Sequence, residues 1–202
     1  MAWDTERTRS LLLDAATIEF SAKGFAGARI DRIAAAAGVN KERIYPYFGG
    51  KLGLFDAVLD RALDDFLSAT PPTGYGADAI ADYAGALFDA YQATPELPRL
   101  LAWEGLEFAG EAEAALARQS SCAAKVAQLA GAFPDLGAER AAELLVSIVA
   151  LVTSHWSLPQ LPAMIQGRAP AVTERRATLI EQVRALAGSA PEQTGPTRPD
   201  FS

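Results

Sequence analysis

Charged and aromatic side chains alternate in one short segment, residues 41–51, whose sequence is KERIYPYFGGK. Lysine and arginine donate hydrogen bonds to phosphate oxygens and base edges, and tyrosine hydroxyls contact the phosphate backbone. Asn40 directly precedes the segment, and two more cations, Arg29 and Arg32, stand shortly before it. These residue types at this spacing indicate contact with a nucleic acid.

Side chains suited to catalysis are scarce in this sequence. It contains one histidine, His155, and one cysteine, Cys122, and it has no phosphate-binding glycine loop. The common arrangements for nucleophilic and nucleotide chemistry are therefore absent. Cys122 cannot form an internal disulfide, which agrees with a reducing compartment. We expect a protein that is not an enzyme and that uses no metal and no cofactor.

The charges are unevenly distributed along the chain. The 202 residues have a formal net charge of −7, which is unusual for a protein that binds nucleic acid. Residues 1–60 contain eight basic and eight acidic side chains, and residues 20–52 contain six basic and two acidic ones. The sequence therefore predicts a mildly basic N-terminal part on an acidic body.

Apolar residues recur at helical spacing along almost the whole chain, and no run alternates convincingly in the manner of a β-strand. The expected fold class is all-α with about nine helices. Gly24 should end the first helix, and the Asn40 side chain should cap the third. Pro46 lacks an N–H, so we expect the third helix to be regular only to about Tyr45. Helices are predicted over residues 6–23, 30–37, 41–48, 51–68, 77–93, 96–109, 111–131, 138–157 and 173–187.

Two short helices joined by AGVN, residues 37–40, fit a helix-turn-helix, whose second helix enters the major groove of DNA. The surrounding segment, residues 19–55, reads EFSAKGFAGARIDRIAAAAGVNKERIYPYFGGKLGLF. Its order, spacing and residue types resemble the DNA-binding domain of the TetR family of transcriptional regulators. The segment departs from the family pattern at Arg29, at NKE (residues 40–42), at Pro46 and at GGKLG (residues 49–53).

The resemblance implies an N-terminal three-helix helix-turn-helix domain and a C-terminal helical domain for ligand binding and dimerisation. We place the DNA-binding domain at residues 1–50, a connecting helix at 51–70, the C-terminal domain at 71–188 and a disordered tail at 189–202. Base edges should be contacted by Lys41, Glu42, Arg43 and Tyr45, and phosphates by Arg29, Arg32, Tyr47 and Lys51. Asn40 completes the expected DNA-binding set as the helix cap.

The function implied is that of a TetR-like repressor, which binds a palindromic operator in double-stranded DNA as a homodimer and is released by a small, mostly apolar effector. We expect it in the cytoplasm, since it has neither the apolar core of a signal peptide nor a membrane-spanning run. An alternative is a helical ligand-binding or adaptor protein that has lost its affinity for DNA. Candidate effector-binding residues are Tyr83, Phe88, Trp103, Glu104, Phe108, Cys122, His155 and Trp156.

Overall fold

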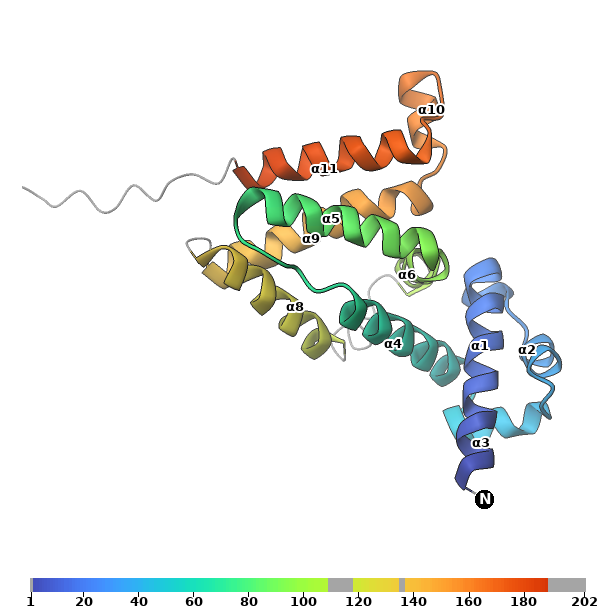
Figure 1. Cartoon of the computed structure of the whole chain (residues 1–202). Coiled ribbons are helices and arrows are strands. Elements are labelled where there is room, and N and C mark those ends of the chain that lie inside the picture. The colour runs from blue at the N-terminus through green and yellow to red at the C-terminus, as the bar shows by residue number, and fades with distance from the viewer. Residues whose placement is uncertain (1, 109–117, 135–136, 189–202) are drawn as a thin grey trace, which may run out of the picture.

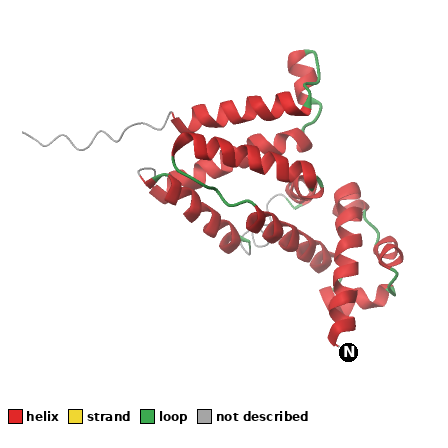
Figure 2. Ribbon diagram, viewed as in Figure 1, coloured by secondary structure: helices red, strands yellow, loops and turns green. Residues whose placement is uncertain are grey.

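The computed structural model describes residues 2–108, 118–134 and 137–188 (Figure 1). Helices are the only regular elements in these ranges, as Figure 2 shows, so the predicted all-α fold class is confirmed. The described residues form ten α-helices, one of which, α10 (Leu161–Gln166), lies where the sequence predicted a loop. The start of the helix expected over 111–131 and the tail expected over 189–202 lie outside the described residues. No helix in the described ranges is long and apolar enough to span a membrane.

The N-terminal helices pack around one hydrophobic core. They are α1 (Ala2–Gly27), α2 (Ile30–Ala37), α3 (Ile44–Phe48) and the first half of α4 (Lys51–Ala69). Their apolar side chains recur every three or four residues, so each helix buries one stripe. The core is filled by side chains with at most 2% exposure, including Leu12, Phe20, Ile33, Ile44 and Phe55. In Figure 1 α1, α2 and α3 lie at the N-terminal end of the molecule, and α4 runs from them toward the remaining helices.

Gly24 was predicted to end the first helix; in the structure it breaks the helical geometry there, and α1 continues after this kink to Gly27. Its backbone has φ 69° and ψ 176°, a conformation in which only glycine is common. A Cβ atom added at this position would lie 2.8 Å from a ring carbon of Trp103 on α6 (Glu96–Glu107). The missing side chain therefore allows the end of α1 to turn and to lie directly against α6.

The third helix differs from the sequence prediction. It begins with a 3-10 turn, Lys41–Arg43, which Asn40 caps by accepting the N–H of Glu42 at 3.0 Å. Regular α3 follows the turn and reaches Phe48, and the Gly49 N–H donates to the Tyr45 carbonyl at 2.8 Å.

The expectation that Pro46 would leave this helix regular only to about Tyr45 is therefore wrong. Because α3 starts at Ile44, Pro46 stands in its first turn. The N–H groups of a first turn have no partner inside an α-helix, so a proline there removes no α-helical hydrogen bond. The irregular turn precedes Pro46 instead of following it.

The C-terminal helices form a second bundle around their own core. They are α5 (Gly76–Ala93), α6, α8 (Gln119–Ala132), α9 (Gly137–Ser157) and α11 (Val172–Gly188), with α10 between the last two. Helix α11 lies along α5, and Arg176 and Arg184 on α11 form ion pairs with Asp89 and Asp78 on α5, both at 2.7 Å. In Figure 1 α5, α9 and α11 run side by side, and α10 projects beyond their ends.

Two helices contribute to both cores and so join the bundles. Helix α4 places Leu59 in the N-terminal core and Phe66 in the C-terminal core. Helix α6 places Leu100 in the N-terminal core and Leu97 in the C-terminal core. A displacement of either helix relative to one bundle therefore strains its contacts with the other.

Candidate nucleic-acid interface and pockets

The third helix presents its polar side chains to solvent. Ile44 is fully buried and anchors the helix, while Lys41, Glu42 and Arg43 are exposed and Tyr45 is 61% exposed. The 3-10 turn places the three charged residues before the buried anchor, at the end of the helix where the Asn40 cap lies. A helix that is anchored on one side and polar on the other can enter the major groove.

Lys41 is not a free cation in this structure. Its ammonium group lies 3.0 Å from the carboxylate of Asp31 on α2, and this hydrogen bond raises the pKa of Lys41 above its usual value. Both side chains are exposed, so the contact can exchange with water or with a phosphate. Sequence reasoning placed Lys41 at base edges without foreseeing this partner.

The two arginines near the start of α2 both interact with Glu19 on α1. The backbone N–H of Arg29 donates to the Glu19 carboxylate at 3.2 Å, and the guanidinium of Arg32 lies 3.8 Å from the same oxygen. Arg29 occupies the N-cap position of α2 without a side-chain cap bond, so its long side chain remains exposed. Glu19 thereby fixes the start of α2 while both guanidinium groups stay accessible.

Lys51, at the start of α4, and Tyr47, on α3, both have contacts within the N-terminal bundle. The Lys51 ammonium lies 4.7 Å from the centre of the Phe25 ring and 3.4 Å from the Ala26 carbonyl. Tyr47 is half-buried, and its ring contacts Phe48 with 6.2 Å between centroids. Lys51 therefore also has a structural role, which its position at a helix start did not reveal.

Arg9 on α1 is a further candidate that the sequence did not single out. Its guanidinium lies 5.5 Å from the centre of the Phe48 ring, so it reaches the end of the third helix although it precedes that helix by more than thirty residues. The side chain is exposed and can meet a phosphate beside α3. The arginine was not recognisable from sequence because the contact depends on how α1 crosses α3.

The candidate effector residues do not surround one described pocket. Phe88, His155 and Trp156 form an aromatic cluster with ring centroids 4.8 to 5.3 Å apart. Tyr83 is buried in the same C-terminal core. Cys122 is exposed on α8.

The remaining three candidates lie where the two bundles meet. Trp103 donates its indole N–H to the Ser21 carbonyl at 3.3 Å, and Phe108 packs against Phe25 with 5.0 Å between ring centroids. Glu104 forms an ion pair with Arg118. These three side chains hold α6 against α1 and against the residue that precedes α8.

A pocket of about 430 Å³ lies between α4, the turn that joins α5 to α6, and the middle of α1. This volume is within the range typical of small-molecule sites, about 300 to 1,000 Å³. Its apolar lining consists of Ala62, Phe66, Ala69, Ala90, Ala93 and Leu97. Its polar lining consists of Thr17, Arg61, Asp65, Thr94 and Glu96. None of the eight candidate effector residues belongs to it.

A smaller pocket of about 200 Å³ lies between the end of α9, α10 and α11. Its polar lining includes His155, Ser154 and Arg175, whose guanidinium donates to the Ser154 hydroxyl at 3.2 Å. Apolar side chains of α10 complete the lining. Burial, together with the positive charge of Arg175, lowers the pKa of His155 below its usual value. His155 is thus neutral at neutral pH and can accept or donate one hydrogen bond.

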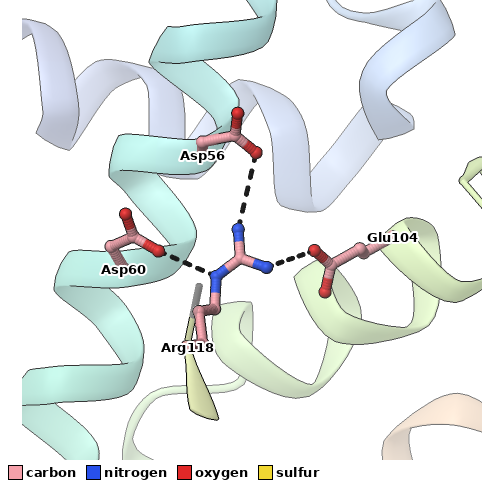
Figure 3. Close-up of polar contacts among 4 residues, drawn as sticks. All are labelled: Asp56, Asp60, Glu104 and Arg118. Carbon is pink, nitrogen blue, oxygen red and sulfur yellow. Dashed lines mark hydrogen bonds and ion pairs between the residues drawn. The ribbon is translucent and has the colours of Figure 1, made fainter. Parts of the chain in front are cut away.

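A cluster of charges ties α4 to the C-terminal bundle, as Figure 3 shows. The guanidinium of Arg118 lies 2.8 Å from Asp60, 3.4 Å from Asp56 and in contact with Glu104. Its side chain is only 9% exposed. Burial raises the pKa of Asp56, and the adjacent Arg118 partly offsets this effect. Charges this buried hold their partners in a specific geometry, because an unpaired one is costly.

A second buried cation holds the other end of α4. The ammonium of Lys125 on α8 donates to the carbonyls of Leu67 at 2.6 Å and Thr70 at 2.9 Å. Carbonyls at a helix end lack partners within the helix, and a cation satisfies them and opposes the helix dipole favourably. Burial lowers the pKa of Lys125.

Taken together, a capped and exposed polar helix, a helix-turn-helix and a separate helical domain define a DNA-binding protein of the helix-turn-helix class. Comparison with known proteins agrees. The sequence profile for bacterial regulatory proteins of the tetR family matches residues 12–58. The profile for the C-terminal domain of tetracycline-repressor-like proteins matches residues 79–185.

Individual relatives extend this likeness over most of the chain. The transcriptional repressor SCO4008 of Streptomyces coelicolor is 39% identical over 180 residues, which cover 86% of this chain and 91% of that protein. The repressor NicS of Pseudomonas putida is 37% identical over 109 residues, about half of each chain. The crystal structure of SCO4942 from Streptomyces coelicolor superposes with a TM-score of 0.70 at 33% identity and covers 89% of this chain and 97% of that one.

This chain belongs to the TetR family of transcriptional regulators. It is therefore a regulator and not an enzyme.

Proposed function

We propose that this protein is a transcriptional repressor that binds a palindromic operator as a homodimer and leaves it when a small, mostly apolar effector binds. The observation that carries the proposal is the third helix, whose exposed charged side chains stand on a buried anchor, Ile44. The relatives SCO4008 and NicS are named as repressors, which supports the sign of regulation. The protein would act in the cytoplasm, where its DNA is.

The DNA contacts divide by type in this proposal. Arg43, Lys41 and Tyr45 reach base edges from the major groove, and Glu42 accepts a hydrogen bond from a cytosine amine. Phosphates are held by residues around the helix, namely Arg29, Arg32, Tyr47, Lys51 and the newly recognised Arg9. Asn40 fixes the turn that orients the base-contacting residues, because its side chain caps the Glu42 N–H.

The domain division remains a proposal, and dimerisation is assigned to its C-terminal part. Residues 1–50 would bind DNA, 51–70 would connect, and 71–188 would dimerise and bind the effector. Helices α9 and α11 leave large apolar side chains exposed, among them Val146 at 70% and Leu186 at 46%. Two copies joined through these faces would place their DNA-binding heads on half-sites roughly 34 to 36 Å apart.

Release by the effector requires a pocket whose shape differs between the DNA-bound and the free arrangement. The larger pocket is the candidate for such a site, because its lining comes from α1 and α4 as well as from α5 and α6, so a displacement between the two bundles would change its shape. The effector site would then extend beyond residues 71–188 to side chains of α1 and α4. Among the residues predicted from sequence, His155 lines the smaller pocket and would be a polar anchor there. A coupling of about 1 to 3 kcal/mol would weaken operator binding by about 5- to 150-fold.

The test is a titration of the protein with operator and random DNA by fluorescence anisotropy, with the operator taken from selection on random sequences. Arg43→Ala should weaken operator binding by about 1 to 3 kcal/mol and leave random DNA nearly unaffected. Lys51→Ala should weaken both and reduce the salt dependence. Arg140→Ala, an exposed arginine on α9, is the control and should change neither.

Two results would contradict the proposal. Equal losses on both DNAs for Arg43→Ala would remove the base-reading role of the third helix. No salt-dependent binding to any selected DNA would instead favour the alternative of a helical ligand-binding protein without DNA affinity.

A further inference from the structure

We infer that the larger pocket, between α4 and the α5–α6 turn, binds an organic cation, a molecule with one positive charge on a rigid apolar body. The inference rests on the proposed effector-released repressor only for its regulatory consequence, since ligand binding itself needs no DNA. Three observations carry it. They are the composition of the pocket wall, the ion pairing of the charged side chains that line the pocket, and the position of the pocket relative to α4.

The wall of the pocket is mainly hydrocarbon. Phe66, Leu97 and the methyl groups of several alanines supply most of it. The alanines leave open space because larger residues at Ala62 or Ala90 would fill it. Phe66 stacks on Tyr91 with 4.2 Å between ring centroids, so the aromatic wall is held rigidly. Such a wall suits a bulky apolar body, and an aromatic face also attracts a cation.

The charged side chains of the pocket favour a positive ligand. Arg61 is already compensated, because its guanidinium lies 2.9 Å from Asp14 and 3.4 Å from the Thr17 hydroxyl. The carboxylates of Asp65 and Glu96 form no ion pair or hydrogen bond with any described residue. The pocket therefore has two unpaired negative charges beside an apolar wall.

This arrangement discriminates between ligand classes. An anion would approach two carboxylates and would have to displace Asp14 from Arg61 to find a partner. A neutral apolar molecule would gain the same contacts with the wall but no attraction from Asp65 and Glu96. A lipophilic cation gains both the contacts with the wall and the attraction to the two carboxylates, of which Glu96 is partly buried and Asp65 is exposed.

The position of the pocket would allow a bound cation to affect the DNA-binding domain through α4. The pocket residues of α4, which include Arg61, Asp65 and Ala69, lie on the side of this helix opposite Asp56, Asp60 and the Leu67 carbonyl. Arg118 and Lys125 thus hold α4 from one side, and the ligand would occupy the opposite side. A bulky cation between α4 and the α5–α6 turn would displace α4 relative to Arg118 and Lys125.

The experiment uses the full chain and a matched pair of probes, tetraphenylphosphonium and tetraphenylborate, which have nearly the same shape and opposite charge. Binding is measured by isothermal titration calorimetry in sodium buffer at pH 7. We expect the cation to bind at least 10-fold more tightly than the anion. Asp65→Asn and Glu96→Gln should each weaken binding of the cation by about 5-fold or more, since they remove charge without changing shape.

Two further variants locate the site. Ala90→Leu fills the pocket and should abolish binding of both probes, whereas Glu139→Gln removes an exposed carboxylate on α9 and should change nothing. Equal affinity for the two probes, or unchanged affinity for the cation in the Asp65 and Glu96 variants, would overturn the inference. Because no DNA is present, failure to find an operator leaves this result intact. Conversely, if the protein binds its operator normally but has no affinity for the cation, this inference fails and the proposed repressor function is unaffected.

Discussion

Arg118 and Lys125 are seven residues apart in sequence and hold α4 at two points, Asp60 at 2.8 Å and the Leu67 carbonyl at 2.6 Å, respectively. Arg118 directly precedes α8, and Lys125 lies inside it. A spacing of seven residues brings both cations to the same side of a helix, two turns apart. The helix that begins beside the recognition helix is thus fastened along its length to one element of the C-terminal bundle. We expect α8 to follow any displacement of α4.

Replacing Arg118 by methionine should destabilise the protein by about 1 to 3 kcal/mol, less than for a fully buried pair because Asp56 and Asp60 are partly exposed. The methionine keeps the apolar contacts but leaves three neighbouring carboxylates without a cation. Urea unfolding at pH 7 measures the change. The loss should shrink as the pH falls through the raised pKa of Asp56, because a protonated Asp56 is neutral and no longer needs the cation. Arg140→Met on the exposed side of α9 is the control.

Replacing Asp31 by asparagine should increase affinity for DNA. The change frees Lys41 from its 3.0 Å ion pair and removes a negative charge beside the third helix. We expect tighter binding to operator and random DNA alike, by about 2- to 10-fold at low salt, with a steeper salt dependence. Anisotropy titrations at two salt concentrations measure both effects. Weaker binding by this variant would show that the Lys41–Asp31 contact organises the interface instead of competing with it.

Gly24→Ala should destabilise the fold by about 1 to 3 kcal/mol. An alanine disfavours the observed φ of 69°, and its methyl group would overlap the Trp103 ring. Gly27→Ala is a matched control in the same segment, because a Cβ there meets only the Lys23 side chain at 3.5 Å. Urea unfolding of both variants measures the difference. If Gly27→Ala costs as much as Gly24→Ala, the special role of Gly24 is refuted.

His155 should make stability depend on pH between neutrality and mild acid. Its pKa is lower in the folded protein than in the unfolded chain, where it is about 6.5. The unfolded chain therefore binds the proton first, so stability is full above about pH 6.5 and falls as the pH drops through this value. Thermal unfolding at pH 7.5 and 5.5 should show a larger decrease for the natural protein than for His155→Gln. Identical decreases would mean that other groups cause the effect.

Local signals in the sequence were sufficient for most helix boundaries. The second helix was predicted over residues 30–37, and α2 is Ile30–Ala37. Gly24 and Asn40 act where their backbone and capping preferences placed them. Local reasoning failed at Pro46, because the effect of a proline depends on where the helix begins, and the 3-10 turn moved that point. It also missed α10 in a segment rich in proline.

The sequence by itself determined the family, the all-α class and the identity of the exposed third helix, since these depend on spacing within a few turns. Only the tertiary structure decided which side chains meet across the fold. Arg118 finds Asp60 58 residues away, Lys125 finds Thr70 55 residues away, and Arg61 finds Thr17 44 residues away. Such contacts depend on how helices cross, and helical periodicity determines which face of a helix is apolar but not what that face meets. The pocket beside α4, with its two unpaired carboxylates, was invisible in the sequence for that reason.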